Sequence, residues 1–316
     1  MTLYAIEQKW LGLGKESTRG TSTTPTKYFP ISADTELDYK LNLIEDELLR
    51  GDFEKRPPYS GTKEGSGTIN LDVNSLNIGY FLHSLLGNPQ NTLLGTLAYK
   101  HIFKRDTSIS LPSYTITIHR GISTKKYPFS VVKSISFNFS TDNIIKATIT
   151  SLFKTEEEYT NPPTPSFTEL NPLMFYNTTV EVGGTQSNVI KNLTLTIDNG
   201  AIPLRVLNGS QDITDIISHA KLIITGSFTI YFEKETERSN FLTNTSSSLE
   251  INCTGSQIEE DYNHGLKFTL PQIHYTSYPF GNVDGLLGAS VTFNAYYKLS
   301  ASNSLEIELV NTIDQY

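Results

Sequence analysis

Cysteine is almost absent from this sequence, since Cys253 is the only one. An intrachain disulfide and a cysteine-based zinc site are therefore excluded. No run of 18 apolar residues occurs, so no segment is expected to span a membrane. The first ten residues lack the basic and apolar regions of a signal peptide, so none is expected. Stability must then come from a packed core, for which 316 residues are ample.

Charged residues are also scarce, at 18% of the chain, and the formal net charge is −8. The charge is uneven, because residues 1–160 carry a net +1 and residues 161–316 a net −9. A chain without a basic surplus has no overall electrostatic attraction to nucleic acid. The acidic second half therefore argues against a protein that grips DNA.

The residues that are abundant favour strands and turns. Thr is frequent, beside 17 Tyr and 16 Phe, and these three residue types suit pleated, half-buried strands. Asn and Ser, also frequent, suit the turns between strands. The composition predicts an all-β fold.

Alternating apolar and polar residues locate the strands. In the first half they predict strands at residues 37–44, 68–73, 114–119, 132–139 and 144–153. In the second half they predict strands at residues 191–198, 221–232, 266–270, 289–297 and 305–310.

Helical spacing is confined to short segments. Asn74 or Ser75 can cap a helix that runs to Leu86, where Gly87 and Pro89 end it. Residues 212–219 predict a short helix from the spacing of three isoleucines, and residues 236–243 predict another.

Three polar segments divide the chain. Residues 11–30 are small and turn-rich, which indicates an extended arm or loop. Residues 50–67 combine adjacent prolines, four glycines and several charges, and so predict a long exposed loop. Residues 156–165, with three acids followed by three prolines, predict an interdomain linker. We therefore expect an N-terminal arm (1–30) and two domains (31–160 and 161–316).

The two halves show a weak internal repeat. Leu41 and Leu43 correspond to Leu193 and Leu195 at a shift of about 152 residues. Other pairs of similar residues in the two halves are separated by up to about 160 residues. Landmarks in the same order at a nearly constant shift favour a duplicated domain. The further pairs are Gly67, Ile69 and Leu71 with Gly226, Phe228 and Ile230; Phe81-Leu82 with Phe241-Leu242; and Phe137-Asn138 with Phe293-Asn294.

No catalytic arrangement is visible. None of the six histidines has the i, i+4 spacing of a helical zinc site, and each is expected at the surface or partly packed. Gly65-Ser66-Gly67 precedes a predicted strand, which favours a turn over a phosphate-binding loop. Two spaced carboxylate pairs occur, Asp212 with Asp215 at a predicted helix start and Glu306 with Glu308 on a predicted strand. Cys253 is expected to be a small buried hydrophobe. We therefore expect neither an enzyme nor a bound cofactor or metal.

Two stretches carry a family resemblance. The first consists of LGKESTRGT (13–21), LIEDELLRGDF (43–53) and GSGTINLDVNSLNIGYFLHSLLG (65–87). The second consists of VEVGG, LTLTIDNGAIPLRVLNGSQDITDI and ITGSFTIYFEKETERSNFL, and ends near residue 242. In this order the segments resemble the tail tube proteins of long-tailed bacteriophages, in the branch with a duplicated tube domain.

The resemblance implies two tandem β-sandwich domains that form part of a ring. Single-domain relatives form hexameric rings, and a duplicated chain would form an equivalent ring from three copies. Stacked rings would form the channel for DNA ejection. The implied partners are the chain itself, the tape measure protein and, transiently, genomic DNA in the lumen, with tail initiator and terminator proteins at the ends. The implied location is the virion tail, assembled in the host cytoplasm without contact to a membrane.

One loop is expected to contact the adjacent ring. The resemblance places that contact in the loop at residues 50–67, and we expect its basic side chains to dock on an acidic surface. The candidate contact residues are Arg50, Phe53, Lys55, Arg56, Tyr59 and Lys63.

Two alternatives remain open at this point. One is another tail component with the same fold, such as a terminator or a baseplate hub. The other is a carbohydrate-binding adhesin module, in which the 17 tyrosines would form a sugar-stacking surface.

Overall fold

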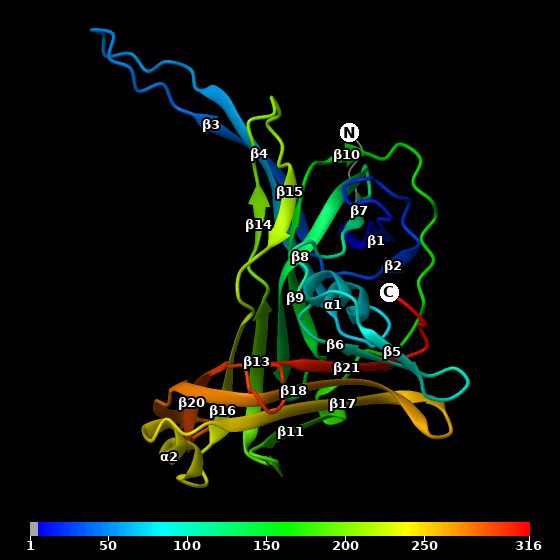
Figure 1. Ribbon diagram of the computed structural model, residues 1–316, viewed down its shortest axis with the longest axis vertical. Coiled ribbons are helices and arrows are strands. Elements are labelled where there is room, and N and C mark those ends of the chain that lie inside the picture. The colour runs from blue at the N-terminus through cyan, green and yellow to red at the C-terminus, as the bar shows by residue number, and fades with distance from the viewer. Residues whose placement is uncertain (1–5) are drawn as a thin grey trace.

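The computed structural model of the chain describes residues 6–316 and confirms an all-β fold (Figure 1). Two short α-helices occur in this range, α1 (Ile78–Leu86) and α2 (Thr236–Leu242). The strands of the first half are β1 (Lys9–Lys15), β2 (Lys27–Phe29), β3 (Glu36–Ile44), β4 (Tyr59–Asp72), β5 (Gln90–Leu93), β6 (Tyr99–Phe103), β7 (Tyr114–Arg120), β8 (Thr124–Ser140), β9 (Lys146–Phe153) and β10 (Glu157–Glu158). Those of the second half are β11 (Thr178–Val182), β12 (Thr185–Gln186), β13 (Ile190–Asp198), β14 (Ala201–Leu204), β15 (Asp215–Ser218), β16 (Ile223–Tyr231), β17 (Ser247–Glu259), β18 (Tyr262–Ser277), β19 (Phe280–Val283), β20 (Leu286–Ala295) and β21 (Glu306–Asn311).

The main sheet runs through both halves of the chain. Its strands pair antiparallel in the order β3-β4-β9-β8-β13-β16-β20, and the end of β18 together with β19 pairs with β20 at the far side. The central pair joins the halves, since β8 lies beside β13 with Phe137 opposite Leu195. The halves therefore share one sheet.

A second set of strands covers the apolar face of the main sheet. It includes β6, β21, β18, β17 and β11, and β21 of the second half pairs with β6 of the first. In Figure 1 these strands run across the direction of β8 and β13. The two halves are thus joined in both layers.

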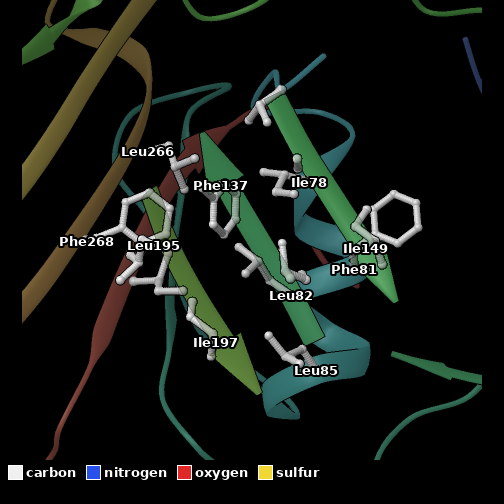
Figure 2. Close-up of a cluster of buried hydrophobic side chains, with 14 of the residues drawn as sticks. Ile78, Phe81, Leu82, Leu85, Phe137, Ile149, Leu195, Ile197, Leu266 and Phe268 are labelled. Atoms are coloured by element: carbon white, nitrogen blue, oxygen red, sulfur yellow. The ribbon is translucent and has the colours of Figure 1, made fainter. Parts of the chain in front are cut away.

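Helix α1 lies over the apolar face of the main sheet near the junction. Figure 2 shows Phe81, Leu82 and Leu85 of α1 directed toward the side chains of β8, β9 and β13. Phe137 packs edge-on against Phe268 of β18, with 4.8 Å between ring centroids. Because Phe137 belongs to the first half and Phe268 to the second, the halves also share one core.

The segment predicted as an N-terminal arm is built into this core. Residues 9–15 form β1, which pairs with β7, and Leu11 and Leu13 are buried. The buried Glu16 carboxylate accepts hydrogen bonds from the backbone N–H of Gly20 and of Phe129, both at 2.7 Å. It also accepts hydroxyl hydrogen bonds from Ser113 and Thr115. The loop prediction is therefore wrong for residues 11–15, because they pair with β7, more than 90 residues away, as well as with the nearby β2.

Other elements confirm the pattern or correct it. The strands predicted at residues 37–44, 68–73, 114–119 and 132–139 are present, and so are the helices near residues 78–86 and 236–242. The helix predicted at residues 212–219 is wrong, because residues 215–218 form β15, which pairs with β14. The predicted loop at residues 50–67 is shorter, since β4 begins at Tyr59. The strand β17 was missed, although Leu249, Ile251 and Cys253 alternate within it.

The main sheet contains the same four-strand unit twice. The order β3-β4-β9-β8 is repeated by β13-β16-β20 and the β18–β19 segment. The register repeats as well: Gly67 lies opposite Leu37 and Ser151, and Gly226 lies opposite Leu195 and Phe293.

A β-bulge repeats at the same place in each unit. The register of β8 against β9 shifts between Val132 and Ser134, and that of β18 against β20 shifts between Tyr275 and Ser277. Two of the sequence landmarks were misaligned. Leu195 corresponds to Leu37 and not to Leu43, and Phe293 corresponds to Ser151 in β9 and not to Phe137.

Burial of His83 predicts a pH-dependent stability. Its Nε2 lies 2.9 Å from the side-chain amide oxygen of Asn88 and its Nδ1 lies 2.6 Å from the Tyr114 hydroxyl. Burial lowers the pKa of His83 from 6.5 to about 4. The unfolded chain then binds the proton more tightly, so this contribution is complete above about pH 6.5 and is lost as the pH falls toward 4. The free energy of unfolding should fall by about 3 kcal/mol from this source.

Urea unfolding at a series of pH values measures the effect. Between pH 7 and pH 5, His83→Gln should unfold with a flatter pH dependence than the wild-type chain. Equal slopes for the two proteins would contradict the assignment.

Candidate assembly surface

The main sheet has one apolar and one polar face. On the core side Ile149, Phe137 and Leu195 are buried, and the residues that alternate with them lie on the opposite face. That face carries an uninterrupted row of hydroxyl and amide side chains across six strands. The row consists of Asn70, Thr148, Ser136, Thr196, Thr225 and Asn294, each directly opposite the next.

Hydrogen bonds connect neighbouring side chains of this polar face. The Thr148 hydroxyl donates to the side-chain amide oxygen of Asn70 at 2.7 Å, and the Ser136 and Thr196 hydroxyls are 2.9 Å apart. The second contact crosses the junction between the two halves. The row itself is uncharged and offers phosphates no ionic contact, the kind of contact that dominates the affinity of proteins for DNA. Charged residues flank it on the same face, since Asp72, Lys146 and Asp198 lie two residues along their strands from Asn70, Thr148 and Thr196.

The main sheet ends in two strands that pair on one side only within residues 6–316. These are β3, which pairs with β4, and β19, which pairs with β20. Long cations cover part of the β3 edge: Arg120 donates to the Leu37 carbonyl at 3.0 Å, and Lys9 donates to the Thr35 carbonyl. Such coverage is a common protection of edge strands against unwanted pairing.

The predicted contact residues lie on a hairpin formed by β3, residues 45–58 and β4, here called the first hairpin. It projects from one end of the molecule (Figure 1). Arg50 pairs with Asp46 at 2.7 Å and Lys55 with Glu45 at 3.0 Å. Arg56 pairs with Asp52, and the Phe53 side chain is fully exposed.

The base of the first hairpin holds the other two predicted residues. The Tyr59 hydroxyl lies 3.4 Å from an Asp46 oxygen, and Lys63 lies over the ring of Tyr39. The structure thus brings five of the predicted residues together on the hairpin, with Lys63 at its base. Residues 45–58 contain five acids and three bases, and each base is paired with an acid of the hairpin. Docking of these basic side chains on an acidic surface stays a prediction.

A second hairpin, β14–β15, projects toward the same end of the molecule (Figure 1). Unlike the first hairpin, it packs on the other half of the chain. Its residues Ala201, Ile213 and Ile216 form a small buried cluster with residues of the first half. Those first-half residues are Leu111, Phe129, Val131 and Leu152.

Polar contacts fix the base of the second hairpin. Arg19 donates to the Ile216 carbonyl at 2.6 Å, and Arg105 donates to the Ser218 carbonyl at 2.9 Å. The buried Asn199 amide donates to the carbonyls of Leu85 and Val132, both at 2.9 Å. Sequence patterns missed this anchor because its parts lie more than 65 residues apart.

Three of the six histidines and the cysteine lie in the interior of the protein. His83, His101 and His264 are buried, contrary to the expectation of surface or partly packed histidines. Burial raises the pKa of the Cys253 thiol to about 12, which suppresses its reactivity. Gly65-Ser66-Gly67 lies inside β4 and not in a turn.

The spaced carboxylates are engaged in ion pairs or hydrogen bonds. Glu306 pairs with Lys104 at 2.7 Å and Asp215 with Arg19 at 3.1 Å, and Asp212 accepts from the Tyr39 hydroxyl. In the described part of the chain no cluster of His, Cys, Asp and Glu suits a metal ion. Over the same residues no helix is long and apolar enough to cross a membrane.

A family model described as phage tail tube protein matches residues 9–295, which span both four-strand units and both hairpins. No curated protein matches the chain.

The anchor of the second hairpin can be tested by mutation. Asn199→Ala leaves two buried carbonyls without a donor, so it should lower the free energy of unfolding by about 1–3 kcal/mol. Asn208→Ala, at the exposed tip of the same hairpin, is the matched control and should stay within about 0.5 kcal/mol of wild type. Urea denaturation measures both, and equal stability of the two variants would contradict the anchor.

Proposed function

The chain belongs to the phage tail tube proteins, and on that premise we propose that its copies assemble into rings that stack into the channel for DNA ejection. The observation that carries this proposal is the continuous main sheet, with an uncharged row of side chains across its polar face and a strand at each end that pairs on one side only. Joining such sheets edge to edge closes a ring and removes the free edges.

The polar face of the main sheet suits the inner wall of the channel. DNA must pass without being held, and release of counterions at Lys and Arg is what holds it. The row from Asn70 to Asn294 contains no charge. The apolar face is covered by the second layer, so the polar face is the one left for the lumen.

The repeated four-strand unit supports a ring of three copies. Three copies would supply six units, equivalent to the hexameric rings of single-domain tube proteins. Residues 31–160 and 161–316 would then be the two tube domains, with residues 156–165 connecting them.

We assign the contact between stacked rings to the two hairpins. Both point to the same end of the molecule (Figure 1), as an axial contact requires. On the first hairpin the contact set is Arg50, Phe53, Lys55, Arg56, Tyr59 and Lys63, with the exposed Leu48 and Leu49 beside it. Because the three basic residues at the tip are paired, we expect the apolar side chains to carry most of this contact.

The role is structural and needs neither catalysis nor a cofactor. The expected partners are the tape measure protein and transient DNA in the lumen, and the initiator and terminator proteins at the tube ends. The expected site is the virion tail, after assembly in the host cytoplasm. A terminator or hub built on the same fold is the alternative that the assembly experiment below must exclude.

The carbohydrate-binding alternative finds less support. A sugar-stacking surface needs exposed aromatic rings, whereas many tyrosines lie in the interior. The buried ones are Tyr80, Tyr114, Tyr127, Tyr275, Tyr278 and Tyr316.

Negative-stain electron microscopy of the purified full-length chain tests the proposal. We expect stacked rings or hollow tubes, on their own or after addition of a tail initiator complex. Particles that stay monomeric at high concentration even with an initiator present would overturn the tube assignment.

Lysines on the polar face should convert the channel into a DNA-binding one. In Thr148→Lys/Thr196→Lys, tubes assembled with short duplex DNA should retain nuclease-protected DNA on the order of tenfold above wild type at low salt, and release it at high salt. The control places two lysines at the exposed Thr243 and Thr254, where any bound DNA should stay nuclease-sensitive. Equal protection by the two double variants would place the polar face outside the lumen.

Charges at the tip of the first hairpin should shorten the tubes. In Leu49→Asp/Phe53→Asp, stacking should lose apolar contact while rings still form, since both side chains are fully exposed in the free chain. Lys55→Glu/Arg56→Glu should shorten tubes less, because these cations are paired within the hairpin. Length distributions in micrographs decide, and normal lengths for both variants would remove the hairpin from the ring–ring contact.

A further inference from the structure

The two hairpins occupy equivalent positions but have opposite burial. Ala201 lies opposite Ser218 in the second hairpin, and Leu43 lies opposite Ser60 in the first. Ala201 is 1% exposed, whereas Leu43 is 57% exposed. The larger apolar side chain is therefore the one left in solvent.

The same contrast extends along the hairpin bases. Counted from Leu195 and Leu37, Asn199 corresponds to Leu41 and Ile202 to Ile44. Asn199 is fully buried in the chain while its counterpart Leu41 is exposed, but Ile202 and Ile44 are both exposed. The apolar strip of the first hairpin, Leu41 and Leu43, thus lacks the cover that Asn199 and Ala201 have.

The missing cover can be identified from the junction inside the chain. The second hairpin packs on the end of the unit that precedes it, where Val131 and Leu152 lie opposite each other. No unit precedes the first hairpin within residues 6–316. The corresponding surface is the end of the second unit, which can only come from another copy.

We propose that the first hairpin of each copy packs on the second unit of a neighbouring copy, in the way that β14–β15 packs on the first unit within the chain. This inference rests on the proposed ring. It makes the internal β8–β13 junction the template for the contact between copies.

The receiving surface follows from the repeated register. Val131 corresponds to His274 and Leu152 to Asn294, which also lie opposite each other. Asn294, the last residue of the polar row, would then be covered by the neighbouring hairpin and not face the lumen. The ring of Tyr296 lies 5.4 Å from that of His274, and Tyr297 and Leu299 beside it are exposed. Tyr296, Tyr297 and Leu299, beside this polar pair, supply the aromatic and apolar side chains that suit the apolar strip of the first hairpin.

The strand edges follow the same template. Phe137 lies opposite Leu195 in the chain, and its counterpart Phe280 would lie opposite Leu37 of the next copy. Arg120, which now donates to the Leu37 carbonyl, would have to turn away when the strands pair. Pro279 does not obstruct the pairing, because its carbonyl accepts from Ser290 and its missing N–H therefore faces inward.

A cysteine pair tests the register directly. Continued along the strands, the template puts Leu43 of one copy opposite His274 of the next. In Leu43→Cys/His274→Cys, oxidation should link chains covalently, with one discrete largest species on a denaturing gel because the ring closes. The only native cysteine, Cys253, is buried and can remain.

Two controls use the same chain. Ala201→Cys/Val131→Cys should link within one chain, since this pair is the internal equivalent. Leu43→Cys/Phe280→Cys should not link, because position 280 lies six residues from 274, about 20 Å along a strand.

A second variant does not depend on disulfide geometry. Leu43→Lys should leave the Tm of the free chain unchanged, because the side chain is exposed there, and should abolish ring formation. Ala201→Lys, its buried counterpart, should lower the Tm of the free chain.

The outcomes separate this inference from the proposed function. Rings that form without the Leu43–His274 link, or rings of unchanged yield from Leu43→Lys, would overturn the inference and leave the tube role standing. Linked chains without rings would support the contact and overturn the tube role. If neither the disulfide link nor rings form, both the inference and the proposed function are contradicted.

Discussion

The pairing of β8 with β13 is the interaction on which the rest of the structure depends. It continues one sheet across the two halves, and it places Phe137 beside Leu195 in one core. It also brings the second hairpin onto Val131 of the first half. A chain of two separate sandwiches would leave two more strand edges unpaired, and exposed edges promote uncontrolled association.

Edge strands create the conflict that an assembling sheet must resolve. The strand that pairs with a neighbour must be accessible, yet an accessible edge also invites wrong partners. In the free chain Arg120 and Lys9 occupy carbonyls of the β3 edge. Their hydrogen bonds are exchangeable with those of a correct partner, whereas a covering helix would have to unfold. In the proposed ring, the apolar strip at Leu43 would supply the specificity that backbone pairing lacks.

Much of the fold was predictable from local patterns. Alternation located β3, β7 and β9, and the family resemblance placed the contact residues on the loop that proves to be the first hairpin. The errors have a common cause. The isoleucines of residues 212–219 fit a helix by spacing, but their burial against Phe129 favours the extended hairpin. Residues 11–15 have loop-like composition, but their pairing with β7 and the buried Glu16 order them.

The sequence by itself determined the strand content, the absence of a disulfide, and the alternation that separates an apolar face from a hydroxyl face, because these depend on residue type and on spacing within one strand. Tertiary structure alone decided which strands meet, that Thr196 lies beside Ser136, and that one hairpin is covered while its equivalent is not. Those outcomes depend on contacts between residues far apart in the chain, and local patterns carry no information about such partners.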